Sequence, residues 1–104
     1  MNEAYELVLQ FRGREVETED EVVEIEDVLF EFLTPEETLD GHEVGAHARN
    51  ISFTTGDPRQ TFARMKPFLS QAALIDHMIA AFRRLPEHAY TVIWPAQAAA
   101  FSRT

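Results

Sequence analysis

Four side chains able to bind a metal ion or move a proton lie close together in the sequence: Asp40, His42, Glu43 and His47. Imidazole nitrogens and carboxylate oxygens are ligands for zinc and similar ions. The spacing argues against a metal site, because the two histidines are an odd number of residues apart and would face opposite sides of a strand. Only a bend at Gly45 would bring them together. The pattern therefore favours surface histidines and predicts no metal site and no cofactor.

Hydroxyl groups that could act as nucleophiles occur at Ser52, Thr54 and Ser70, but no base lies near them in the sequence. A Ser, His and Asp set can be drawn from almost any chain of this length, so it carries no weight. Gly56-Asp57-Pro58 could offer backbone amides to an anion, yet it lacks the glycine run and lysine of a phosphate-binding loop. The chain has no cysteine, which excludes disulfides and thiolate catalysis. We therefore predict no catalytic residue and favour a protein that is not an enzyme.

The carboxylates gather in the first part of the chain. Residues 1–43 carry fifteen of the eighteen Asp and Glu residues and a net charge of −13, whereas residues 44–104 carry +4. No Lys or Arg occurs between Arg14 and Arg49. An acidic field of this kind attracts basic partners and disfavours nucleic acid and anionic lipid. We therefore expect a basic protein partner, with no nucleic acid and no membrane as partners.

The length of 104 residues is that of one domain, and 45% hydrophobic residues with eight Phe are enough for a core. No apolar run approaches the roughly 20 residues needed to span a bilayer. The N-terminus MNEAYELV lacks the basic start of a signal peptide. We expect a cytoplasmic protein with one domain at 1–95 and a frayed tail at 96–104.

The first half of the chain contains one strand pattern and one helix pattern. Residues 5–11 alternate in polarity, which predicts a half-buried strand. Thr18 and Glu21 have the spacing of a capping box, so a helix begins at residue 19 and ends at Thr34-Pro35. At 100° per residue, one apolar stripe runs along this helix. It comprises Val22, Ile25, Val28, Leu29, Phe32 and Leu33.

The second half predicts two short strands, near 42–45 and at 50–55, followed by a helix that Asp57 caps and Pro58 opens. Pro67 lies inside this helix and should kink or restart it. Residues 74–85 fit a helical face and the first strand of a hairpin equally well. Residues 90–94 alternate as a strand, which Pro95 ends.

This order of elements resembles the ferredoxin-like α/β plait, in which a split βαβ pattern puts two helices on one face of an antiparallel sheet. The resemblance is carried by YELVLQF, the capped acidic helix, NISFTTGDP and YTVIWP. It implies an α+β fold, with a C-terminal hairpin strand as an added alternative. The pattern also resembles small uncharacterised bacterial proteins, and it implies no activity, because this fold hosts many functions.

The polar face of the first helix carries the strongest functional signal. Asp20, Glu24, Asp27 and Glu31 lie together opposite its apolar stripe, without the lysines that usually offset them at i,i+4. The functional interpretation is a docking surface for a basic protein. The structural alternative is a solvated face that keeps a small protein soluble.

Two apolar residues, Val23 and Phe30, lie seven positions apart on a second face of this helix, with Glu26 between them and the core stripe. They indicate either a partner or dimer surface that includes a half-buried carboxylate, or a broad core face. A homodimer could pair the acidic helix with the basic half of a second copy, and internal neutralisation is the alternative.

We predict a protein-interaction or regulatory module with five partner-binding residues on the first helix. They are Val23, Glu24, Asp27, Phe30 and Glu31. The alternative function is small-molecule binding in the cleft between sheet and helices or at a dimer interface. Its predicted lining residues are Tyr5, His42, Arg49 and Trp94.

Overall fold

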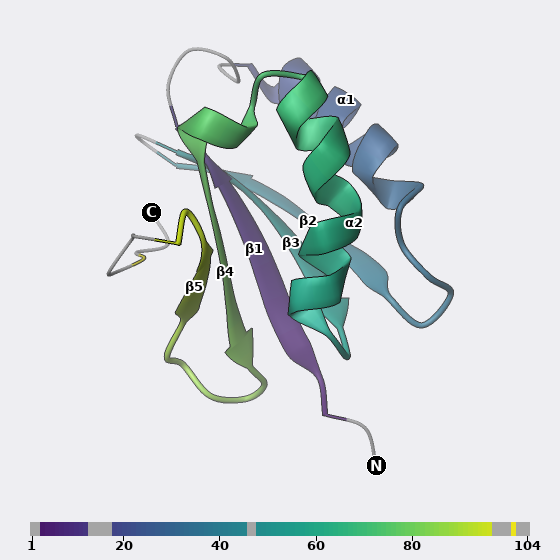
Figure 1. The fold of residues 1–104 in the computed structure, drawn as a ribbon, viewed down its shortest axis with the longest axis vertical. Helices are drawn as coiled ribbons and strands as arrows, with labels where there is room; N and C mark the ends of the chain where they lie inside the picture. Colours follow the sequence, from purple (N-terminus) through teal and green to yellow (C-terminus); the bar gives the residue numbers. More distant parts are fainter. Residues whose placement is uncertain (1–2, 13–17, 46–47, 97–100, 102–104) are drawn as a thin grey trace.

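A computed structural model describes residues 3–12, 18–45, 48–96 and 101 of the chain. Five strands form one open antiparallel sheet with two helices, so the fold is α+β (Figure 1). The elements in chain order are β1 (Tyr5–Phe11), α1 (Glu19–Phe30), β2 (Thr38–Val44), β3 (Arg49–Thr55), α2 (Pro58–Gln71), the 3-10 helix η1 (Ile75–His77), β4 (Met78–Arg84) and β5 (Thr91–Trp94).

The strands lie in the order β2-β3-β1-β4-β5, and every neighbouring pair is antiparallel. The two strands that α1 connects, β1 and β2, are therefore parallel to each other, with β3 between them. Likewise α2 connects β3 and β4, which are parallel with β1 between them. Among the described residues, no further strand pairs with β2 or with β5, which lie at opposite edges of the sheet.

The core lies between one face of the sheet and both helices. Alternation along the strands puts Leu7, Leu9 and Phe11 on the same face as Ile51 and Phe53. Burying each of these large side chains contributes roughly 1.5–3 kcal/mol. The helices meet them with two apolar stripes, Val22, Ile25 and Leu29 from α1 and Phe62, Met65 and Leu69 from α2. Both helices therefore cover the same face.

The two N-terminal caps predicted from sequence are present. The Thr18 hydroxyl accepts from the Glu21 amide at 3.2 Å, and the Glu21 carboxylate accepts from the Thr18 amide at 3.1 Å. Asp57 caps α2 by accepting from the Gln60 amide at 3.2 Å. The helix α1 ends at Phe30, before the predicted end at Thr34-Pro35. After Phe30 the chain continues with i,i+3 hydrogen bonds, such as that from Phe32 N–H to the Leu29 carbonyl, which turn it more tightly than an α-helix does.

Residues 74–85 form η1 and then β4, so the hairpin alternative is confirmed for this segment. β4 pairs with the central strand β1 along its whole length. This pairing decides between helix and strand in a segment whose apolar residues fitted the periodicity of either. In contrast to the predicted restart, α2 continues through Pro67 to Gln71. Pro67 is exposed, so its ring does not disturb the buried stripe.

Two strands differ from the sequence pattern, β2 in its length and β1 in its burial. β2 begins at Thr38 rather than near His42. β1 is buried on both faces from Leu7 to Phe11, because it is the central strand. Its second face carries polar side chains that satisfy each other, as the Gln10 amide donates to Asn50 Oδ1 at 3.0 Å. The predicted tail at 96–104 lies mostly outside the described residues, but the Phe101 ring packs on Tyr90.

Candidate functional site: the α1–β2 side of the molecule

All five predicted partner-binding residues are exposed on α1 and its C-cap. The side chains of Val23 and Phe30 are large apolar groups, and these residues are 40% and 59% exposed. Glu24, Asp27 and Glu31 are exposed beside them. The helix thus presents apolar and acidic side chains to solvent together.

The described cations of the second half of the chain are engaged away from α1. Arg64 pairs with Glu37 at 2.6 Å, Arg83 with Glu6 at 2.9 Å and Arg84 with Glu3 at 2.8 Å. Lys66 lies over the Trp94 ring and Arg59 over the Phe82 ring. Within the described ranges, no ion pair reaches the outer carboxylates of α1, which are Asp20, Glu24, Asp27 and Glu31.

A β-bulge decides which face of β2 carries His42. Leu39 pairs with Phe53 and Gly41 with Ser52, so Asp40 is an extra residue in the strand. Gly41 has a φ of +124°, which L side chains rarely adopt. Because of this insertion, Leu39 and His42 both face α1, although they are three positions apart and would face opposite sides of a regular strand.

His42 connects the edge strand to two carboxylates of α1. Its Nδ1 lies 2.7 Å from Glu26 Oε1, and its Nε2 lies 3.2 Å from Glu19 Oε1. Burial alone would lower the pKa of His42, but the hydrogen bonds and charges of Glu19 and Glu26 outweigh it and raise that pKa above its ordinary value. Glu26 is 8% exposed, so its carboxylate is buried, more deeply than the half-buried position that the partner-surface interpretation expected.

The contacts of His42 also fix the orientation of α1. Glu19, Val23, Glu26 and Phe30 are spaced i, i+4, i+7 and i+11, so they share one stripe of the helix. Since Glu19 and Glu26 of this stripe reach His42, the stripe faces β2, and the exposed residues Val23 and Phe30 belong to the same stripe. Val44 of β2 is 51% exposed. Among the described residues, these three are the exposed large hydrophobic side chains.

The structure does not gather the four residues predicted to line a small-molecule site. Tyr5 packs edge-on against Phe82 near the start of β1. Trp94, on β5, donates from its indole nitrogen to the Ile75 carbonyl at 2.8 Å. Arg49 begins β3 and donates to the carbonyls of Gly45 and Ala48, whereas His42 is held by α1. Apolar side chains fill the space between sheet and helices.

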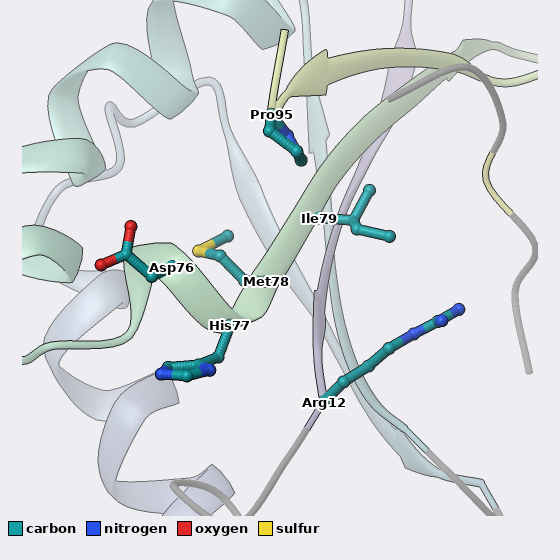
Figure 2. A pocket seen from close by; sticks show the side chains of 6 residues that line it. All are labelled: Arg12, Asp76, His77, Met78, Ile79 and Pro95. Atoms are coloured by element: carbon teal, nitrogen blue, oxygen red, sulfur yellow. The ribbon is translucent and has the colours of Figure 1, made fainter. Parts of the chain in front are cut away.

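Two hollows lie elsewhere on the surface. The larger, of about 430 Å³, surrounds the start of β4 and is lined by Arg12, Asp76, His77, Met78, Ile79 and Pro95. Figure 2 shows Arg12 and Ile79 on one side of the β4 ribbon and Asp76 and Met78 on the other. The smaller, of about 130 Å³, lies at the bulge and is lined by Glu6, Asp40, Gly41, His42, Glu43 and Ser52.

A buried polar cluster around Glu37 was not predicted. Its Oε2 accepts hydrogen bonds from Thr55 at 2.8 Å, Thr61 at 2.6 Å and Arg64 at 2.6 Å. Burial would raise the pKa of Glu37, but these bonds, with that from the Thr34 amide, lower it to about 2. No local signal could have revealed the cluster, because its members lie up to 27 residues apart. It holds the loop after α1 against β3 and α2.

Comparisons of this chain with protein-family models, with curated proteins and with solved structures give no match. In the described parts of the chain, no group of three or more His, Asp or Glu side chains could hold a metal ion. His47, one of the candidate ligands, lies outside those parts. No described helix combines the length and the apolar character that crossing a membrane requires.

Proposed function

We propose that this protein is an interaction or regulatory module that binds a basic protein through α1, using Val23, Glu24, Asp27, Phe30 and Glu31. The single observation that carries the proposal is the lack of neutralisation of the outer face of α1 within the described residues. Like charges at Glu24/Asp27 and Asp27/Glu31 repel each other and destabilise the helix. The described arginines that form ion pairs do so with other glutamates and leave this repulsion in place. A basic partner would relieve that repulsion.

The apolar neighbours support the same proposal. Charged side chains alone give fast and salt-sensitive association, whereas affinity usually comes from a few desolvated apolar or aromatic groups. Val23 and Phe30 supply such groups beside the carboxylates. A Phe that is mostly exposed on a helix contributes little to the core, and contact with a partner would bury it.

The experiment compares capture of proteins from extracts of the source cell by the wild type, by Asp27→Lys and by Glu87→Lys. The two variants change the charge equally, but Glu87 lies in the exposed turn between β4 and β5, at the far side of the sheet. We expect one stoichiometric basic protein on the wild type and on Glu87→Lys, released by moderate salt, and its loss from Asp27→Lys.

Circular dichroism and thermal unfolding of both variants establish that their folds are intact. Equal capture of the partner by Asp27→Lys and the wild type would exclude the outer face of α1 as the binding surface. Equal loss from both variants would mean that only the net charge of the chain matters.

For the fold, we infer the ferredoxin-like plait with one added strand. The order β2-β3-β1-β4, with each helix joining parallel strands across a third, supports this assignment. β5 is the added strand and forms a hairpin with β4. An experimental structure with a different strand order would overturn the inference.

The second candidate function, small-molecule binding, is favoured by the hollow at the start of β4. The hollow is lined by the apolar residues Met78, Ile79 and Pro95, and the side chain of Ile79 lies on the same side of the β4 ribbon as the cationic side chain of Arg12 (Figure 2). A thermal shift with an apolar anion that Arg12→Ala removes and Asp27→Lys retains would favour this function over the first.

A further inference from the structure

We propose that the open edge of β2 binds an extended segment of a basic partner as a sixth strand, with alternating apolar and basic side chains. This inference rests on the proposed function for its choice of a basic partner. It adds the conformation of the bound segment, the element it pairs with and the pattern of its side chains.

The edge of β2 is available for strand addition. β2 has seven residues, pairs with β3 on one side and ends the sheet on the other. An edge strand presents unpaired backbone donors and acceptors, and an added strand lies about 4.8 Å away. β2 contains no proline that would block pairing.

On the helix side of this edge, a bound segment would meet apolar groups. Val23 and Phe30 belong to the stripe of α1 that faces β2, and Val44 lies on β2 itself. Every second side chain of an added strand points to this side. Apolar side chains there would remove all three of these exposed groups from water at once.

On the other side of the sheet, the bulge opens the small hollow of about 130 Å³. Gly41 contributes no side chain, and a Cβ built on it would meet nothing within 4 Å. Three carboxylates line the hollow, from Glu6, Asp40 and Glu43, and that of Glu6 is already paired with Arg83. Asp40 accepts hydrogen bonds from the hydroxyls of Thr38 and Thr54, both neutral groups. A long cationic side chain, such as Arg, suits this hollow in size and charge.

Charge complementarity also selects the occupant. Pairing of two β2 edges from two copies would bring Asp40 and Glu43 of both chains together below two acidic helices. Like charges placed in this way across strands are destabilising. The same charges attract a basic strand, so the occupant of this edge is a basic segment of a partner and not a second copy of the chain.

The test uses the full chain and a seven-residue synthetic peptide that alternates Arg and Val, matched to the length of β2. Binding is measured by calorimetry, and amide hydrogen exchange of residues 38–44 is followed by NMR. We expect saturable binding and slower exchange of amides in β2. Two further peptides carry N-methyl groups on alternate backbone nitrogens, one on the odd and one on the even positions, so that the side chains stay and half of the backbone donors are removed. Only one of the two sets of N–H groups would face β2, so one methylated peptide should bind roughly tenfold or more weakly and the other should bind like the parent.

Matched variants locate the basic side chains. Asp40→Lys, and Asp40→Asn to a smaller extent, should weaken binding of the peptide, roughly tenfold for the lysine, while Glu87→Lys leaves it unchanged. A peptide with Glu in place of Arg should not bind. Asp40→Asn keeps an oxygen that accepts from one of the two threonine hydroxyls, and its amide group can donate to the other, so it tests the charge if the lysine variant fails to fold.

The outcomes separate this inference from the proposed function. Absence of peptide binding, equal binding of both methylated peptides, unchanged exchange in β2, or a dimer of the pure protein paired through β2 would each overturn the sixth strand. If the native partner is nevertheless captured and lost with Asp27→Lys, the proposed function stands without it. If the peptide protects β2 and no basic partner is captured, the edge site stands and the proposed function fails.

Discussion

His42 Nδ1 lies 2.7 Å from Glu26 Oε1, which joins an edge strand to a buried position of the helix above it. Glu19 holds the other ring nitrogen at 3.2 Å. One imidazole thereby fixes the rotation of α1 over β2 and, with it, the positions of Val23 and Phe30. The surface proposed for partner binding thus adjoins an interaction that depends on the protonation of His42, whose pKa Glu19 and Glu26 raise above its ordinary value.

The first prediction concerns the pH dependence of stability. The pKa of His42 is raised in the folded protein. The stabilisation that His42 provides is therefore complete at pH values below its pKa in the unfolded chain, about 6.5, and is lost as the pH rises through its pKa in the folded protein. The free energy of unfolding should therefore fall with increasing pH above about 6.5. Urea titrations across this range should show a smaller fall for His42→Asn than for the wild type.

His88→Asn is the control, because His88 is an exposed histidine in the turn between β4 and β5. At about pH 6, His42→Asn should cost roughly 1–2 kcal/mol, as expected for hydrogen bonds to charged groups. Identical pH profiles of His42→Asn and the wild type would contradict the assignment of this dependence to His42.

The second prediction concerns acid stability. The pKa of Glu37 is about 2 in the folded protein against 4.5 for the ordinary group, so its contribution is complete above about 4.5 and is lost as pH falls through about 2. The difference corresponds to roughly 3 kcal/mol. Glu37→Gln should be destabilised at neutral pH and should lose less stability than the wild type on acidification, as measured by urea unfolding.

Glu36→Gln is the matched control, since the neighbouring Glu36 is exposed. It should follow the wild-type curve at every pH. If Glu36→Gln and Glu37→Gln behave alike, the hydrogen bonds from Thr55, Thr61 and Arg64 do not carry the effect.

The third prediction separates binding from stability on α1. Asp27→Lys replaces repulsion of Glu24 and Glu31 by attraction, so the free energy of unfolding should rise by about 0.5 kcal/mol. Capture of the basic partner should be lost in the same variant. A decrease in stability would show that Asp27 has a structural role.

The fourth prediction compares two adjacent residues of α1. Leu29 is fully buried in the core, whereas Phe30 is 59% exposed. Leu29→Ala should cost about 2–5 kcal/mol, and Phe30→Ala should change the free energy of unfolding by less than about 0.5 kcal/mol. Phe30→Ala should still weaken partner binding. A large loss of stability in Phe30→Ala would show that Phe30 packs in the core and would contradict its assignment to the partner surface.

The sequence alone determined the elements whose signals are local. The capping box of Thr18 and Glu21 and the Asp57 cap depend on residues three positions apart, so they could be recognised without the fold. The exposed acidic face of α1 followed from helical periodicity for the same reason. The alternation of β1 was equally clear, because the side-chain period of a strand is a local property.

The tertiary structure alone decided the features that depend on distant pairing. Residues 78–84 form a strand because they pair with β1 along their whole length. His42 turned toward Glu26 because the bulge at Asp40 shifted the register of β2 against β3. Three arginines of the second half, Arg64, Arg83 and Arg84, pair with Glu37, Glu6 and Glu3, which local patterns could not indicate. Contacts between residues far apart in the chain are set by topology, and periodicity carries no information about them.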